Sequence, residues 1–292
     1  MSSNGHKKEL YFTQVPQRVV SLVPSLTESL FELGFGKSVA AITDYCVHPA
    51  EALKHLPRIG GPRTPRLADI LALQPDLVIA DQDENTREAV EALEAENVPV
   101  WVTQPCTVRE AMDILWKMVE LFRDPKASAR LQTLEVTLNW LADAEQSSFS
   151  YFCPLWQEAD ESPWWITFNE FTYMHDLLRL MGGRNVFAQR RRRYPLEADL
   201  GRAEAQPAAG RDTRYPRVPL AEVCAAQPEV ILLPDEPFAF DAQQQAQFAS
   251  WLAETPAVRN GRLIHFDGSL ITWHGTRLAR ALRDLPQLLA VS

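Results

Sequence analysis

The chain contains one short pattern twice. Residues 67–79 read LADILALQPDLVI, and the pattern returns at residues 220–232 as LAEVCAAQPEVIL. Five of the thirteen positions are identical, and six more are exchanges between similar residues. Two copies half a chain apart predict two lobes of similar build rather than a solenoid of many repeats.

Each copy predicts the same local structure. A short amphipathic helix ends at Gln-Pro, because proline lacks an N–H and restricts the residue before it. The continuous apolar run that follows suits a parallel strand buried on both faces. Two such lobes would enclose a cleft, and clefts between domains are common sites for small ligands.

The first half of the chain alternates strands and helices, which predicts a parallel α/β lobe. We expect Ser25 and Glu28 to form a capping box at the first helix, and Thr64-Pro65 to start the first repeat helix. A further helix should begin at about Asn85. The expected strands cover residues 18–23, 39–42, 77–80 and 99–102.

Two helices are expected between the lobes, over residues 107–122 and 124–144. The first carries apolar residues on one face, which favours a connecting strut. The second lobe should then supply strands at 149–153, 164–167, 229–233 and 262–266, and helices at 172–181, 219–226, 243–253 and 275–284.

Residues 190–217 interrupt this alternation. They are rich in Arg, Ala, Pro and Gly without periodicity, which is typical of an inserted, mobile surface loop. Arg190–Arg193 could form a functional basic patch, or could simply be part of that loop. The expected organisation is an N-terminal tail at 1–17, a lobe at 18–105, connecting helices at 106–146 and a second lobe at 147–292.

Composition limits the function. A chain of 292 residues with net charge −9 and a pI of about 5.3 is long enough for two domains and ill suited to bind nucleic acid. No apolar run is long enough to span a membrane. The N-terminus lacks the apolar stretch of a signal peptide, so the sequence indicates either a cytoplasmic protein or one written without its export signal.

Reactive residues give little support for catalysis. The motifs GxSxG, Walker A, HExxH and GxGxxG are absent. The four cysteines form no CxxC pair and are expected to be buried thiols. Cys46 and His48 could share a metal only if their loop curls, and a loop that lines the cleft is the alternative. His274 follows a strand and precedes a helix, where it is either a ligand contact or part of a helix-entry turn.

Aromatic residues give a stronger signal for binding. Trp164, Trp165, Phe168, Phe171 and Tyr173 cluster around one strand end. With Tyr45 and Trp273 they could form an amphipathic wall for a large planar ligand. The alternative is an ordinary hydrophobic core, particularly for Trp165 and Phe171.

Several segments resemble a known family. RVVSLVPSLTESLFELG, DYCVHP, RIGG, LADILALQPDLVIA and GGRNVF are similar to segments of the helical-backbone substrate-binding proteins of ABC importers. The similarity is greatest to the vitamin B12-binding proteins and related metal-chelate receptors. It runs from about Arg18 to Pro286 apart from residues 190–217. It implies an α/β fold of two Rossmann-like lobes with parallel sheets, joined by a long connecting helix, with the ligand in the cleft between them.

The resemblance also implies roles for particular residues. Pro24 and Ser25 match ligand contacts where the first strand meets its helix, and Tyr45 matches the neighbouring loop. Trp165 to Phe168 match the aromatic stretch of the second lobe, and Trp273 matches its C-terminal cleft aromatic, beside His274. Glu88 and Glu236 match the acidic residues that dock on a permease.

The leading hypothesis is a binding protein, not an enzyme, that captures a corrinoid (cobalamin-like) or other metal chelate for an ABC-type importer. It would act as a monomer, without cofactor or bound metal, and outside the cytoplasm. One alternative is a cytoplasmic tetrapyrrole chelatase-like enzyme that uses His48, His274 and Glu170. The other is a cytoplasmic carrier or sensor of the same fold.

Overall fold

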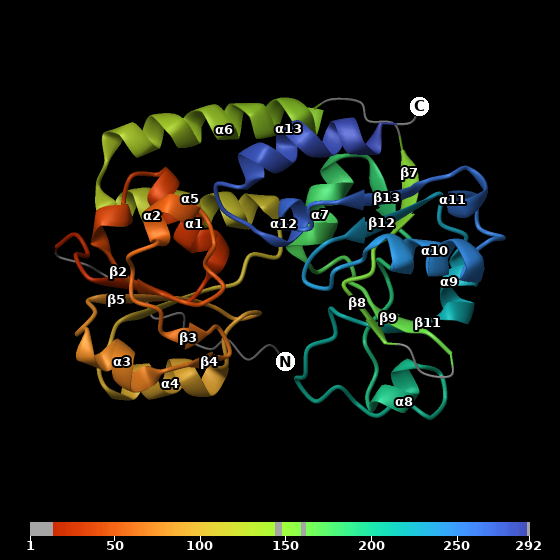
Figure 1. Cartoon of the computed structure of the whole chain (residues 1–292), viewed down its shortest axis with the longest axis horizontal. Coiled ribbons are helices and arrows are strands. Elements are labelled where there is room, and N and C mark those ends of the chain that lie inside the picture. Colours follow the sequence, from red (N-terminus) through yellow and green to blue (C-terminus); the bar gives the residue numbers. More distant parts are fainter. Residues whose placement is uncertain (1–13, 144–147, 159–161, 291–292) are drawn as a thin grey trace. The chain divides into compact units, whose positions relative to one another are not determined.

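The computed structural model describes residues 14–143, 148–158 and 162–290 (Figure 1). Contacts between residues divide the chain into two compact units. The first contains the chain up to Gln104, Met112–Glu135 and Gly275–Arg277. The second contains Pro105–Ala111, Val136–His274 and the residues from Leu278 on.

The first unit is built on a parallel sheet of four strands in the order β2-β1-β5-β6. Helices α3 and α4 cover one face and α1 lies on the other (Figure 1). The core beneath α3 and α4 is aliphatic, with Val20, Val78, Ile70 and Leu93 buried together. The bounds are β1 Val19–Ser21, α1 Pro24–Glu32, β2 Val39–Ile42, α3 Leu67–Ala72, β5 Leu77–Asp81, α4 Arg87–Ala95 and β6 Val100–Thr103.

The second unit repeats this plan with strands in the order β10-β7-β12-β13, again all parallel. Its core is aromatic, because Phe152, Trp165, Phe187, Phe240 and Phe248 are all buried in one cluster. The bounds are β7 Phe149–Phe152, α7 Tyr173–Leu180, β10 Gly183–Asn185, α9 Leu220–Ala226, β12 Val230–Pro234, α10 Ala242–Trp251, α11 Pro256–Arg259, β13 Leu263–Phe266 and α13 Leu278–Leu289.

Both units also contain shorter helices and strands outside their main sheets. The second has an antiparallel sheet in the order β11-β9-β8, and the first has the two-stranded pair β3-β4. These elements are η1 Gly36–Ser38, α2 Ala50–Leu53, β3 Gly60–Gly61, β4 Thr64–Pro65, β8 Trp156–Glu158, β9 Trp164–Ile166, α8 Leu196–Asp199, β11 Arg217–Pro219 and α12 Ser269–Thr272.

The duplicated pattern folds the same way in both units, which confirms the prediction from the repeat. In each copy the glutamine before the proline ends the helix in the left-handed region, with φ of 46° at Gln74 and 47° at Gln227. The acidic residue after the proline then binds the start of the neighbouring strand. Asp76 accepts the backbone N–H of Arg18 (2.9 Å), and Glu229 accepts that of Ser150 (2.5 Å).

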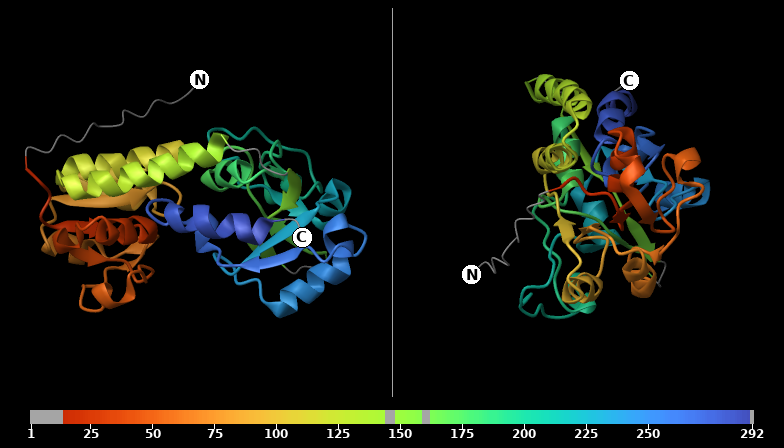
Figure 2. Two further views of the ribbon diagram at one scale, coloured as in Figure 1. Left: turned by 90° about the horizontal axis from the view of Figure 1, so that it is seen from above. Right: turned by 90° about the vertical axis from the view of Figure 1, so that its left-hand side faces the viewer.

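Helices α5 (Val108–Phe122) and α6 (Pro125–Asp143) each contribute residues to both units. They lie side by side (Figures 1 and 2), and Trp116 on α5 donates its indole N–H to Glu135 on α6 at 3.3 Å. The apolar face of α5 is buried as its spacing predicts, since Ala111, Leu115 and Met118 have no exposed surface.

Some local predictions were wrong. Helix α1 begins at Pro24 and has no side-chain cap, because Ser25 is buried and Glu28 pairs with Arg277 instead of reaching back. Thr64-Pro65 does not start a helix but pairs antiparallel with Gly60–Gly61, and α3 begins two residues later. Helix α4 is capped by Thr86, one residue beyond the Asn85 we expected.

Candidate functional site

The loop that follows β2 carries the exposed aromatic residue of the first unit. Its interior is fixed by Cys46, whose Sγ lies 3.2 Å from the hydroxyls of both Thr27 and Thr43. The Arg58 guanidinium donates to the carbonyls of Thr43 and Cys46, each at 2.8 Å. This frame holds Tyr45 with 65% of its surface exposed, at the carboxyl end of a parallel strand, where ligands of α/β sheets bind.

The same loop does not bring Cys46 and His48 together. Burial raises the pKa of the Cys46 thiol, which keeps it protonated and unreactive, and its contacts are the two threonine hydroxyls. His48 is exposed. Within residues 14–143, 148–158 and 162–290, no three His, Cys, Asp or Glu side chains gather closely enough to hold a metal ion.

Pro24 and Ser25, at the junction of β1 and α1, are both buried. Ser25 is 1% exposed, and its hydroxyl has no hydrogen-bond partner in the described part of the chain. Three residues on, Glu28 forms two hydrogen bonds with Arg277, at 2.6 and 2.7 Å. This junction is therefore part of the interior of the first unit, tied to residues near the end of the chain.

Trp273 is half-buried at the end of α12 and its indole N–H donates to the carboxylate of Glu236. Thr272 donates to the same carboxylate at 3.0 Å. Burial raises the pKa of Glu236, and the charges of Asp267 and Asp235 raise it further. The bond from Thr272 helps to hold the Glu236 carboxylate, which in turn holds the indole ring and leaves part of its surface exposed.

His274 is 6% exposed and packs edge-on against Tyr173, with ring centroids 6.2 Å apart. Tyr173 is the first residue of α7, the counterpart of Pro24 on α1. His274 thus lies in the interior beside Trp273, in the turn before α13. The expectation that it follows a strand was wrong, because residues 269–272 form the short helix α12.

The aromatic stretch of the second lobe does not form an exposed wall. Trp165 and Phe168 have no exposed surface. Trp165 donates its indole N–H to Gln157 at 3.0 Å and packs against Phe248 in the core. The core alternative therefore describes Trp165, which β9 directs inward, and the role of these two residues at the ligand stays a prediction.

Other aromatic residues of the second unit are exposed instead. Phe171 is 43% exposed, with the guanidinium of Arg191 3.6 Å from its ring centroid. Trp156 is also 43% exposed and contacts Phe238 edge-on. Reasoning from sequence overlooked Trp156 because its strand, β8, is three residues long and gives no periodic signal.

The two acidic residues matched to permease docking lie in different settings. Glu88 is exposed in the first turn of α4, where a partner could reach its carboxylate. Glu236 is half-buried and already bound by Thr272 and Trp273. The two lobes therefore do not present equivalent acidic groups at these positions.

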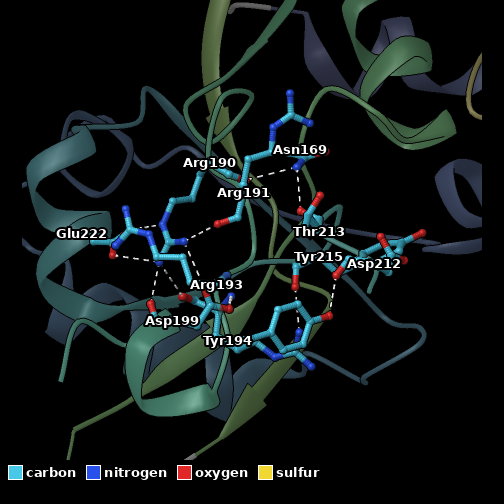
Figure 3. A network of polar contacts seen from close by, with 11 residues as sticks. Asn169, Arg190, Arg191, Arg193, Tyr194, Asp199, Asp212, Thr213, Tyr215 and Glu222 are labelled. Carbon is cyan, nitrogen blue, oxygen red and sulfur yellow. Dashed lines mark hydrogen bonds and ion pairs between the residues drawn. The ribbon is translucent and has the colours of Figure 1, made fainter. Parts of the chain in front are cut away.

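The four consecutive arginines are not a uniform basic patch. Arg190 is 10% exposed and bonds to Asp199 at 2.8 Å and to Glu222 at 3.0 Å (Figure 3). Asp199 itself has no exposed surface. Arg190 is thus a structural residue that anchors the segment 190–217.

The fold and these side chains define a two-unit α/β protein with exposed aromatic residues at strand ends. No helix in the described residues is long and apolar enough to cross a membrane.

The chain matches the periplasmic binding protein family over residues 19–270 and belongs to it. This is a family of solute-binding proteins rather than enzymes, so the chelatase alternative that used His48, His274 and Glu170 is wrong.

Curated relatives cover most of the chain. It is 27% identical over 272 residues to the vitamin B12-binding protein of Vibrio parahaemolyticus serotype O3:K6 (strain RIMD 2210633), covering 92% of this chain and 88% of that protein. It is 26% identical over 255 residues to the vitamin B12-binding protein of Vibrio cholerae serotype O1 (strain M66-2), covering 85% and 79%.

Solved structures show the same fold. The periplasmic vitamin B12-binding protein of Vibrio cholerae superimposes with a TM-score of 0.72 at 23% identity, covering 94% of this chain and 96% of that one. The periplasmic heme-binding protein of Roseiflexus sp. RS-1, in apo form, superimposes with a TM-score of 0.71 at 23% identity, covering 93% and 97%. The predicted α/β class is confirmed.

Proposed function

We propose that this protein is the substrate-binding component of an ABC-type importer, and that it captures a corrinoid or a similar metal chelate outside the cytoplasm. The observation that carries the proposal is the match along most of the chain to proteins named vitamin B12-binding proteins. The protein binds its ligand without transforming it and needs no cofactor of its own.

Two aromatic residues suit a large, partly apolar ligand. Tyr45 extends from a loop that Arg58 and Cys46 hold in place, so little entropy is lost when it contacts a ligand. The carboxylate of Glu236 likewise holds the indole of Trp273 in place. Aromatic rings fixed in this way supply broad contact area to a macrocycle.

Haem is the second candidate ligand. The phenol of Tyr45 is 65% exposed, and a tyrosine oxygen can serve as an axial ligand to haem iron. A corrinoid would use the same ring only as a contact surface. Absorption spectra distinguish the two, because iron ligation by a phenolate shifts the haem bands and Tyr45→Phe would abolish that shift.

Tryptophan fluorescence tests the ligand class directly. Cyanocobalamin absorbs strongly, so it should quench the emission of tryptophans near the bound ligand in a saturable way. Trp273→Phe should reduce the quenching, whereas Trp140→Phe should not, because Trp140 is 72% exposed on α6 and has no proposed role. Equal quenching in both variants would remove Trp273 from the site.

Charge reversal tests the transport role. Glu88→Lys should weaken docking to a permease and leave ligand affinity unchanged, since its side chain is exposed on α4. Glu91→Lys on the same helix is a matched control for loss of negative charge. A cytoplasmic carrier or sensor would show no difference between the two variants.

A further inference from the structure

The segment Arg190–Arg217, here called the arginine segment, concentrates positive charge in an acidic protein. It holds eight arginines and four acidic residues, while the whole chain carries a net charge of −9. A charge run of this kind is ordinarily a solvated surface.

Both ends of the arginine segment are fixed on one buried carboxylate. Asp199 accepts the Arg190 guanidinium at 2.8 Å, the backbone N–H of Arg193 at 2.9 Å and the backbone N–H of Arg217 at 2.8 Å (Figure 3). Asn169 adds hydrogen bonds to the carbonyls of Arg190 and Thr213. The segment is therefore built into the second unit rather than attached loosely to it.

Several of its arginines are neutralised by acids. Arg190 pairs with Asp199 and Glu222, and Arg191 pairs with Glu170 at 3.1 Å. The other pairs join Arg202 to Glu197 and Arg214 to Asp212. Within the part of the chain that the structure describes, no carboxylate lies within ion-pair distance of the remaining four, which are Arg192, Arg193, Arg211 and Arg217.

Two of these four arginines lie against the ring of Tyr194. The guanidinium carbons of Arg192 and Arg211 lie 4.4 and 3.8 Å from the centroid of its ring. The ring is 8% exposed, and its hydroxyl donates to the Asp212 carbonyl at 2.6 Å, which fixes its orientation. A single buried ring thus positions two cations.

Arg217 completes the group. Its Nη1 donates to the carbonyl of Tyr215 at 2.8 Å, which holds the side chain at the base of the segment. Burial lowers the pKa of Arg217 and the nearby charge of Arg192 lowers it further, while the charges of Asp199 and Asp212 act in the opposite direction. Arg192 and Arg217 repel each other, and a bound anion would add to the opposing charge that these two carboxylates supply.

We propose that Arg192, Arg211 and Arg217 form a binding site for an anionic group with several oxygens, a phosphate or a carboxylate. Guanidinium groups present N–H donors that match the oxygens of both anions. Arg211 would contribute its Nη1, because its Nε and Nη2 donate to the carbonyls of Ala208 and Pro207. Because the site lies within the second unit and uses no aromatic ligand contact, binding of a free anion does not depend on the proposed chelate, whereas binding of a carboxylate carried by the ligand rests on the proposed function.

Two sources can supply such a group: a free inorganic anion, or a carboxylate carried by the ligand. The first arm follows the side-chain Nε–Hε resonances of the arginines during titration of the whole protein with inorganic phosphate at low ionic strength. The second arm compares the affinity for haemin with that for haemin dimethyl ester, which lacks the free carboxylates.

The test variant is Arg192→Gln combined with Arg217→Gln, and the matched control is Arg202→Gln, which removes an exposed charge from the same segment. Phosphate binding, or the preference for haemin over its ester, should fall at least tenfold in the double variant and less than twofold in the control. Arg211→Gln alone, at an exposed position, should lower phosphate binding, or the preference for haemin, severalfold. This variant tests the site if the double variant fails to fold.

Three results would overturn the proposal. One is the absence of both phosphate binding and any preference for free carboxylates in the wild-type protein. Another is equal loss in the test and control variants, which would show only a general effect of charge. The last is a phosphate titration that shifts arginines elsewhere in the chain and leaves the three named ones unchanged.

Discussion

The two units share one backbone plan and fill it with different side chains. Register makes Val20 and Phe152 counterparts, because Val20 pairs with Val78 in β5 and Phe152 pairs with Ile231 at the matching position of the second repeat. The first core is aliphatic and the second aromatic. The repeat therefore determines topology, while side-chain volume differs between the lobes.

The second unit also has the longer connections between its strands and helices. In the first unit β1 leads into α1 after two residues, Leu22 and Val23. In the second, the corresponding connection from β7 to α7 contains β8 and β9, and the connection after β10 contains the arginine segment. Additional surface has thus been added to the second unit, and Trp156, Phe171 and the arginine segment lie there, whereas the exposed Tyr45 belongs to the first unit.

The largest expected effect is on the free energy of unfolding, when one side chain is truncated in each of the two cores. Phe152→Ala should cost about 3–5 kcal/mol of unfolding free energy, whereas Val20→Ala should cost about 2 kcal/mol, because the larger side chain leaves the larger cavity. Denaturant unfolding of both variants measures this. Equal costs would mean that the two cores are energetically alike despite their composition.

Each unit also contains a buried ion pair, and the next prediction compares them. Glu28→Gln should cost about 3 kcal/mol, because it removes the carboxylate charge that pairs with Arg277, whose side chain is 4% exposed. Arg190→Gln should cost less, about 2 kcal/mol, because Asp199 keeps two backbone N–H donors.

Thermal and denaturant unfolding measure these costs, and Arg87→Gln, which removes an exposed pair on α4, should leave the midpoint unchanged. A larger loss for Arg190→Gln than for Glu28→Gln would contradict the role given to the backbone donors of Asp199.

Measurements of ligand affinity compare the exposed aromatic residues of the two units. Trp273→Ala should weaken binding of the chelate by about 1–3 kcal/mol, and Tyr45→Ala by about 1–2 kcal/mol, since both rings are expected contacts. Calorimetric titration measures both, with Trp140→Ala as control. If only one variant loses affinity, the ligand contacts one of the two aromatic groups and not the other.

The two glutamines in left-handed conformation allow a smaller test of the repeat. Gln74→Gly should stabilise the protein by up to about 1 kcal/mol, because glycine adopts positive φ without strain. Gln227→Gly should gain less, since it also removes the hydrogen bond from the Gln227 side chain to the Cys224 carbonyl at 2.7 Å. The unfolding midpoints provide the measurement, and a loss of stability at Gln74 would contradict the left-handed assignment.

The smallest effect concerns pH and the two acids matched to docking. The raised pKa of Glu236 means that the folded state holds this proton more tightly than the unfolded state. Its contribution to stability is therefore present below its ordinary pKa and is lost as pH rises through the raised value. Glu236→Gln should flatten the fall in stability over that window, and Glu88→Gln should leave it unchanged. A steeper fall in stability with pH for Glu236→Gln would contradict the raised pKa of Glu236.

The sequence was sufficient for most of the framework. The repeat predicted both β5 and β12 with their helices, since proline and continuous apolar runs act through local chemistry. The sequence did not predict the surroundings of Ser25 and Glu28 correctly, because the partner of Glu28 is Arg277, 249 residues away, and not the start of its own helix. No local pattern indicates such a pairing.

The binding residues were harder to predict for a related reason. Tyr45 and Trp165 are both aromatic residues near strand ends, yet one is 65% exposed and the other has no exposed surface. Which face of a short strand turns inward depends on its partners. In β9 those partners are β8 and β11, both too short to be seen in the sequence.

Calorimetric titration of the purified protein with cyanocobalamin, haemin and a ferric siderophore tests most directly whether this protein binds a metal chelate. We expect saturable one-to-one binding of one of these with micromolar or tighter affinity, about −8 kcal/mol or better. Absence of heat with all three, together with unchanged tryptophan emission, would contradict the claim.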